Sequence, residues 1–227
     1  MRQAKQDMNL REHTRKYCDK DNRLASLSYF GTFAVYFFSL YFAITQIEAW
    51  YIAAPMILIH AFSAVRLYVL QHDCGHHSLF ETRQQNEWAG HGLSPFTFAP
   101  FEVMKQNHNL HHANIGNLEH RETGEIHTMT LREWKEAGFW ERLTYRLYRN
   151  PLVLVPVGSA FTYFIRYRWP KNTTKFGILG VLLHNMVIIA LISLLYYVAG
   201  PTGLWVWLAF SFLGGMIGVF LVYLQHR

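Results

Sequence analysis

The sequence predicts an all-α integral membrane protein with four spanning helices, interfacial helices and a histidine-rich metal site at the cytoplasmic surface. Three observations lead to this fold class. The 227-residue chain is 51% hydrophobic and 16% charged, whereas a soluble domain carries about 25% charged residues. Its apolar residues gather in runs long enough to cross a bilayer, which takes about 20 residues. Six of its 13 histidines fall in two short stretches beside such runs.

The first part of the chain is predicted to form a polar tail and a helical hairpin. Residues 1–23 are polar and lack an apolar core of the signal-peptide kind, so we expect a cytoplasmic tail. Residues 24–47 carry no charge and form the first predicted span, and a second apolar run covers residues 49–70. Only Glu48 separates the two runs. A turn this short returns the chain to the side of its N-terminus.

Two histidine stretches follow the hairpin, and their spacing suits metal binding. They are His72-Asp73-Cys74-Gly75-His76-His77 and His108-Asn109-Leu110-His111-His112. Residues three and four apart share one face of a helix, so each stretch would present a row of imidazoles if it is helical. Neutral imidazole is a ligand for iron, zinc, copper and nickel. The alternative is a set of interfacial histidines that cap membrane helices.

The segments after each histidine stretch are predicted to lie at the membrane surface. Residues 88–101 are apolar but contain Pro95 and Pro100 and are too short to span, so we expect an interfacial or re-entrant piece. Residues 113–149 are hydrophilic, and their basic residues recur at near-helical spacing, which favours an amphipathic helix lying on the membrane. A solvent-exposed helix face is the alternative. Residues 151–165 are expected to dip into the bilayer without crossing it.

The last two predicted spans cover residues 176–199 and 203–224, with a turn at residues 200–202. The second of them carries a small-residue face, where another helix can approach closely. That face consists of Gly214, Gly215 and Gly218.

The distribution of charge gives the topology. Lys and Arg concentrate in cytoplasmic loops. Seven precede residue 24 and ten lie between residues 113 and 175, while the two short turns have none. Both termini and both histidine stretches are therefore expected in the cytoplasm. The net charge of +6 lies beside membrane segments, which favours anionic lipid head groups over nucleic acid as partner. Cys18 and Cys74 suggest no disulfide framework.

The number of histidines bears on the number of metal ions. Zinc hydrolases usually need three protein ligands, so five or six well-spaced imidazoles suggest two ions. Asp73 follows a proposed ligand directly, and its carboxylate would fix the tautomer of a neighbouring histidine, cap the helix end or meet solvent. Asn185 is polar within the third predicted span. Its side chain would either form a hydrogen bond between helices or support a metal ligand from the second coordination sphere, and the sequence leaves both alternatives open.

The two stretches resemble the first two histidine boxes of the membrane fatty acid desaturases. The resemblance to this family extends from about residue 66 to the C-terminus. Residues 121–126 and 145–151 are similar to bacterial acyl desaturases in particular. The resemblance implies a centre of two iron ions that activates O2 and introduces a C=C bond into the acyl chain of a fatty acid or acyl lipid. It also implies a separate electron donor, such as ferredoxin or cytochrome b5, and a multi-pass protein of a bacterial plasma membrane.

The resemblance further implies the iron ligands, which are His72, His76, His77, His108, His111 and His112. His77 departs from the pattern because it adjoins His76 and does not share its helical row. The family has a third histidine box after the fourth span, whereas this chain ends there, and His226 would be one more ligand. We therefore expect residues 24–227 to be a desaturase-like membrane domain that lacks the third box. A fragment of a longer desaturase is expected, with an impaired truncated relative as the alternative.

Three alternatives to a desaturase follow from the sequence. Fatty acid hydroxylases and carotenoid hydroxylases or ketolases use similar boxes, and only product analysis separates them. A metal transporter would place its ligands near the bilayer midplane, whereas these stretches lie at the ends of spans. A membrane remnant without catalytic activity is the third alternative.

Overall fold

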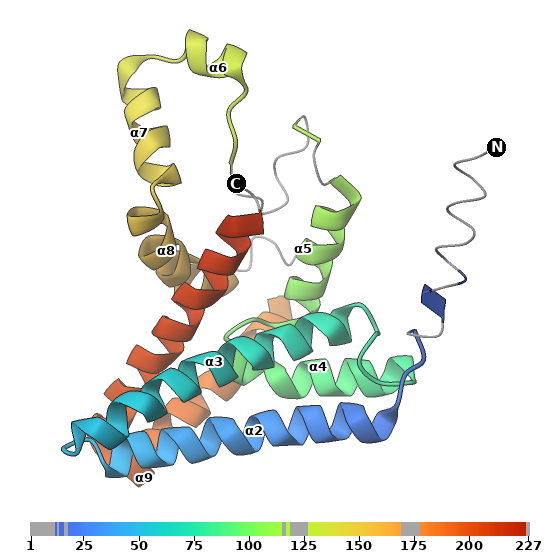
Figure 1. Ribbon diagram of the computed structural model, residues 1–227, viewed down its shortest axis with the longest axis vertical. Helices are drawn as coiled ribbons and strands as arrows, with labels where there is room; N and C mark the ends of the chain where they lie inside the picture. Colours follow the sequence, from blue (N-terminus) through green and yellow to red (C-terminus); the bar gives the residue numbers. More distant parts are fainter. Residues whose placement is uncertain are drawn as a thin grey trace.

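The computed structural model is helical throughout the part that it describes (Figure 1). The described residues are 12, 14–15, 18–114, 117–118, 127–168 and 178–225, and they contain no strand. His226 and residues 121–126 lie outside them. The principal helices are α2 (Asn22–Thr45), α3 (Trp50–Gly75), α4 (Arg83–Thr97), α5 (Phe101–Asn114), α6 (Leu131–Glu136), α7 (Phe139–Arg149), α8 (Pro151–Ser159) and α9 (Ile178–Gln225). A π-helical segment η2 (Ala160–Ile165) and a 3-10 segment η3 (Arg166–Arg168) follow α8.

Helices α2 and α3 form the hairpin that the sequence predicts. Asp21 caps α2, because its carboxylate accepts hydrogen bonds from the backbone N–H groups of Arg23 and Leu24 at 2.7 and 3.3 Å. Lys20 donates a hydrogen bond to the carbonyl oxygen of His77 at 2.6 Å. The end of α3 therefore lies beside the start of α2, as Figure 1 shows.

Three helices in the described part of the chain, α2, α3 and α9, are long and apolar enough to cross a membrane. The third is broken at Gly200, whose φ of 65° and ψ of −170° are not helical. Arg168 donates to both Asn185 and the Phe98 carbonyl, and the Phe98 ring lies 5.2 Å from the ring of Trp207. A straight helix would separate Asn185 from Trp207 by roughly 33 Å, so the two halves of α9 fold back on each other.

The break in α9 falls inside the predicted turn of residues 200–202. The structure has one interrupted helix where the sequence predicts separate third and fourth spans. The two halves, before and after Gly200, correspond to those two segments. The number of bilayer crossings stays a prediction.

Helices α4 and α5 meet at a tight corner below the histidines. A capping box starts α4, in which Thr82 and Gln85 each bind the other's backbone N–H. The helix ends at Phe98, which has a left-handed φ of 56°. A Cβ on Gly90 would lie 2.3 Å from the Phe101 ring, so glycine at this position lets the start of α5 pack directly on α4. The corner thus brings the second histidine stretch, on α5, back toward α3.

The surface segment differs from the prediction of one amphipathic helix. The basic residues from Arg132 to Arg149 divide between α6 and α7, because Ala137 is extended and Gly138 is the N-cap residue of the second helix. Thr130 and Glu133 form a capping box that starts α6, and glycine is a weak helix former. Helix α7 has no buried residue. The predicted dipping segment, residues 151–165, forms α8 and η2.

Candidate metal centre

Four histidines from two helices meet at one end of the α2–α3 hairpin. They are His72, His76, His108 and His112, and each offers a ring nitrogen within 4.8 Å of the others. The Nε2 atom of His108 lies 2.9 Å from Nε2 of His76 and 2.8 Å from Nε2 of His112. The ring of His72 lies 4.3 Å from that of His108. We call these residues the histidine group.

The local sequence explains why the histidine group can form. His72 and His76 stand four residues apart at the end of α3, and His108 and His112 stand four apart on α5. His72 lies in the last turn of α3 and His76 is its C-cap residue, whereas His108 and His112 both lie within α5. Residues four apart share a face, so each helix presents two rings toward the other.

The donor set of the histidine group fits a metal ion. Four imidazole nitrogens at about 2.0–2.1 Å from a metal would stand roughly 3.3–3.4 Å apart in a tetrahedron. The nitrogen separations of 2.9 and 2.8 Å in the structure are only slightly shorter. A small outward movement of the rings would therefore admit an ion.

Burial affects the protonation of two rings of the histidine group, His108 and His76. It lowers the pKa of His108 to about 3, with the neighbouring His72 and His112 rings acting in the same direction. Burial, followed by the same two rings, also lowers the pKa of His76. Both side chains are neutral at pH 7. Metals bind neutral imidazole, so these two rings need lose no proton to become ligands.

Three predicted ligands stand outside the histidine group. His77 has a left-handed φ of 54°, and its Nε2 lies 3.6 Å from Glu87. The His111 ring lies 5.8 Å from that of His112 and 6.2 Å from that of His108. His226 is outside the described residues. The roles of these three histidines as ligands stay predictions.

The two residues predicted to act behind the ligands have different partners. Oδ1 of Asp73 lies 3.3 Å from Nδ1 of His72, which suits a carboxylate that fixes the tautomer and leaves Nε2 for a metal. Oδ1 of Asn185 accepts a hydrogen bond from Arg168 at 2.7 Å. For Asn185 this contact joins α9 to η3, and a metal-related role stays a prediction.

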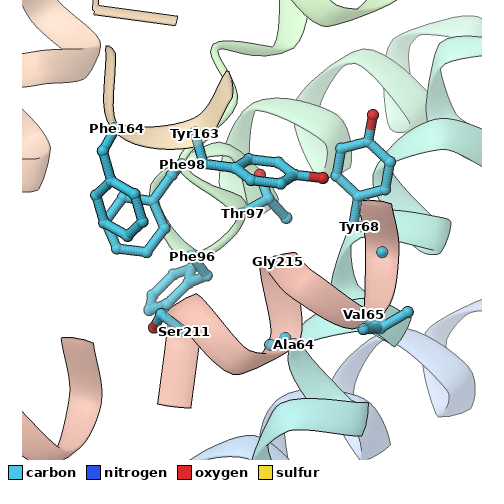
Figure 2. A pocket seen from close by; sticks show the side chains of 12 residues that line it. Ala64, Val65, Tyr68, Phe96, Thr97, Phe98, Tyr163, Phe164, Ser211 and Gly215 are labelled. Atoms are coloured by element: carbon cyan, nitrogen blue, oxygen red, sulfur yellow. The ribbon is translucent and has the colours of Figure 1, made fainter. Parts of the chain in front are cut away.

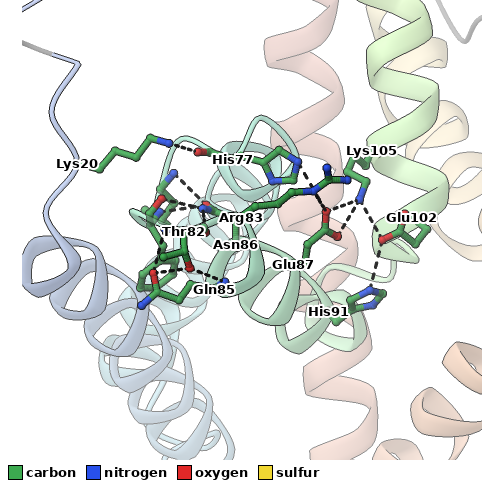
Figure 3. Close-up of polar contacts among 12 residues, drawn as sticks. Lys20, His77, Thr82, Arg83, Gln85, Asn86, Glu87, His91, Glu102 and Lys105 are labelled. Atoms are coloured by element: carbon green, nitrogen blue, oxygen red, sulfur yellow. Dashed lines mark hydrogen bonds and ion pairs between the residues drawn. The ribbon is translucent and has the colours of Figure 1, made fainter.

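A group of charged side chains that was not predicted from the sequence lies between α4 and α5 (Figure 3). Lys105 donates to the Glu87 carboxylate at 2.8 and 3.0 Å and to Glu102 at 3.0 Å. His91 lies 3.4 Å from Glu102. Burial alone would raise the pKa of Glu87, but the hydrogen bond and charge of Lys105 outweigh it and lower that pKa. The spacing of Glu87 and His91, four residues apart, was the available signal.

This charged group also has ligand atoms at metal-binding distances. Those of Glu87, His91 and Glu102 lie within 4.8 Å of one another. The ammonium of Lys105, however, contacts both carboxylates, offsets one of their two negative charges and would compete with a metal ion for their oxygens. We therefore assign an ion-pair cluster here and no second metal site.

An apolar cavity of about 40 Å³ lies beside α3 (Figure 2). Its walls include Tyr68 of α3, Phe98 at the end of α4 and Tyr163 of η2. Tyr68 stands one helical turn before His72 on α3, although no residue of the histidine group lines the cavity itself. A Cβ on Gly214 would lie 3.1 Å from the carbonyl oxygen of Ala61. The second half of α9 thus approaches α3 closely, as the predicted small-residue face requires.

Comparison with known proteins identifies the family. The fatty acid desaturase family model matches residues 48–227. A fatty acid desaturase from Bacillus subtilis (strain 168) is 27% identical over 98% of this chain and 64% of its own length. An sn-1 acyl-lipid omega-3 desaturase (ferredoxin) from Synechocystis sp. is 26% identical over 62% of this chain and 38% of its own length.

A third relative is the acyl-lipid omega-3 desaturase (cytochrome b5), endoplasmic reticulum, from Arabidopsis thaliana. It is 30% identical over 48% of this chain and 28% of its own length. The chain spans less than two thirds of the length of these relatives. No solved structure gives a significant match. The family match, the helices able to span a membrane and the histidine group agree, and the chain belongs to the fatty acid desaturase family.

Proposed function

We propose that the whole protein is an O2-dependent desaturase that introduces a C=C bond into the acyl chain of a fatty acid or acyl lipid. One observation carries the proposal, namely the convergence of four histidines in a chain of this family. The neutral rings of His76 and His108 suit metal binding.

The proposed centre holds two iron ions. His72, His76, His108 and His112 would bind iron through the nitrogens that already face one another. His77, His111 and His226 are the further ligands that we propose. Bound iron supplies the activation of O2. Asp73 would accept the Nδ1 proton of His72 and hold that ring with Nε2 toward the metal.

The cavity beside Tyr68, about 40 Å³ in volume, would receive only a short part of the acyl chain. Most of its lining is aromatic or aliphatic, and Tyr68 stands one helical turn from His72, so a methylene held there would lie toward the histidine group. The net reaction removes two hydrogens from adjacent carbons. O2 takes these together with two electrons and two protons and leaves as two molecules of water. The protein's own residues orient the chain and keep water from it.

The electron donor and the topology complete the proposal. The names of the Synechocystis and Arabidopsis relatives include ferredoxin and cytochrome b5, and a donor of that kind would serve here. We place four spans in a bacterial plasma membrane, with both termini and the histidine group on the cytoplasmic side. The concentration of Lys and Arg in the loops on that side supports this orientation.

Iron content tests the centre. The parent chain, the double variant His76→Ala/His112→Ala and the control His127→Ala would be expressed with added iron and purified in detergent. His127 is a suitable control because it is not a member of the histidine group, and its backbone N–H donates a hydrogen bond to the hydroxyl of Tyr148. We expect iron in the parent and the control and its loss in the double variant. A parent without iron, or a double variant that retains it, would contradict the proposal.

Product analysis tests the reaction. Lipids of cells that express the protein would be analysed by gas chromatography and mass spectrometry. A new double bond that depends on His76 and His112 is expected. A hydroxylated or keto product would assign the protein to the hydroxylases or ketolases instead.

A further inference from the structure

Gln71 directly precedes the first histidine of the group and is fully buried, with 0% of its surface exposed. Its amide nitrogen Nε2 donates to the carbonyl oxygen of Ala99 at 2.9 Å and to Oγ of Ser94 at 3.1 Å. Its amide oxygen Oε1 accepts a hydrogen bond from Oγ1 of Thr97 at 2.7 Å. One side chain of α3 therefore binds three residues of the α4–α5 corner.

The same corner starts the helix that carries the other two histidines. Oγ of Ser94 accepts a hydrogen bond from the backbone N–H of Phe101, the first residue of α5, at 3.1 Å. The same hydroxyl donates to the carbonyl oxygen of Gly90 at 3.1 Å. A continuous chain of hydrogen bonds thus runs from Gln71 to the first residue of α5.

The network lies between the two helices that carry the histidine group. Gln71 adjoins His72 on α3. From Phe101, α5 runs without interruption to His108, a distance of roughly 10 Å at 1.5 Å per residue. Because a helix is stiff over two turns, an anchor at its first residue fixes where its later side chains lie. Gln71 therefore links the two pairs of histidines through a path of buried polar contacts in the corner.

We propose that Gln71 is a positioning residue, which sets the distance between the histidine pair of α3 and that of α5 and so determines how tightly the group binds a metal. This inference rests on the metal site of the proposed function. A buried glutamine that only stabilised the core would affect unfolding and leave metal affinity unchanged.

The test compares two variants of similar severity on the same helix. Gln71→Met keeps the length of the side chain and removes all three hydrogen bonds. His60→Leu is the matched control, because His60 is also 0% exposed on α3 and loses the buried polar contacts of its Nδ1 with the Tyr36 carbonyl oxygen at 3.0 Å and with Oγ of Ser39 at 3.5 Å. His60 lies three turns from His72, and both of these contacts go to α2 and not to the α4–α5 corner. Co²⁺ is the probe, since its visible absorption reports both affinity and coordination geometry.

We expect Gln71→Met to weaken Co²⁺ binding at least tenfold and to change the visible spectrum. The Co²⁺ affinity of His60→Leu should stay within twofold of that of the parent, even if its Tm falls as much as that of Gln71→Met. Thr97→Val removes one bond of the same network and should weaken binding by a smaller factor. With Gln71→Met added, the loss should be less than the product of the two single effects. Thr97→Val also serves if Gln71→Met fails to fold.

Three results would overturn the proposal. Parent-like Co²⁺ affinity in both network variants would show that Gln71 acts on stability alone. An equal loss of affinity in His60→Leu would show that any destabilisation of α3 suffices. Absence of Co²⁺ binding in the parent would refute the metal site itself, and this result differs from the first two because it needs no variant.

Discussion

The Nε2 atoms of His76 and His108 lie 2.9 Å apart, although 32 residues separate the two histidines in the chain. One ring belongs to the end of α3 and the other to α5. No covalent or local constraint brings these rings together. Their contact results from the α4–α5 corner, and several features of that corner can be tested separately.

Metal should stabilise the folded chain. A ligand that binds only the folded state at a free concentration of 100 times its Kd adds about 2.7 kcal/mol to the free energy of unfolding. Co²⁺ should therefore raise the Tm in detergent, measured by differential scanning fluorimetry, and a chelator should reverse the rise. His76→Ala should abolish this rise and His127→Ala should keep it. An unchanged rise in His76→Ala would contradict a site made by the histidine group.

Alanine at position 90 should loosen the corner. The added Cβ would lie 2.3 Å from the Phe101 ring, and relief of such overpacking costs about 1–3 kcal/mol. Denaturant unfolding in detergent should show this loss for Gly90→Ala, and Gly90→Ala/Phe101→Leu should recover part of it. Gly31→Ala is the control, because its Cβ meets nothing within 4 Å. Equal stability of the two alanine variants would refute the close approach.

Alanine at position 200 should strain the reversal of α9. Gly200 has φ 65° and ψ −170°, a region that is essentially open only to glycine and costs other residues about 1–3 kcal/mol. Its Cβ would meet no atom within 4 Å, and neither would that of Gly180 in the helical part of α9. Any difference in Tm between Gly200→Ala and Gly180→Ala therefore reports the backbone alone. If Gly200→Ala is as stable as Gly180→Ala, α9 does not reverse at this residue.

Removing Lys105, the cation of the charged group, should leave the Glu87 and Glu102 carboxylates to repel each other. Lys105→Met leaves the Glu87 and Glu102 carboxylates without their shared partner, and we expect a loss of roughly 1–3 kcal/mol. The pKa of Glu87 should rise in this variant, since Lys105 holds it down. Lys105→Met/Glu87→Gln should regain part of the stability by removing one negative charge.

The control for this prediction is Arg83→Ala. Arg83 also approaches Glu87, at 3.7 Å, but its side chain is 80% exposed. Exposed ion pairs contribute roughly 0–1 kcal/mol, so this variant should stay close to the parent in urea unfolding. If Arg83→Ala were as unstable as Lys105→Met, the exposed Arg83 would stabilise Glu87 as much as Lys105 does, which would contradict the prediction.

Much of this architecture was predictable because it depends on residues a few positions apart. The apolar runs predicted α2 and α3, the single Glu48 between them predicted the hairpin, and the spacing of His72 and His76 predicted two rings on one face. The interruption of α9 at Gly200 was also anticipated. The division of the surface segment into α6 and α7 was not, since the basic periodicity continues across Ala137 and Gly138.

The sequence alone was enough to predict the long apolar helices, the turns between them and the histidines that share a helical face, because helix geometry links residues within about four positions. Tertiary structure decided which four histidines meet, that Gln71 reaches the α4–α5 corner and that Lys105 lies between Glu87 and Glu102. These contacts join different helices. They depend on close packing, such as Phe101 against Gly90, and helical periodicity carries no information about which faces pack together.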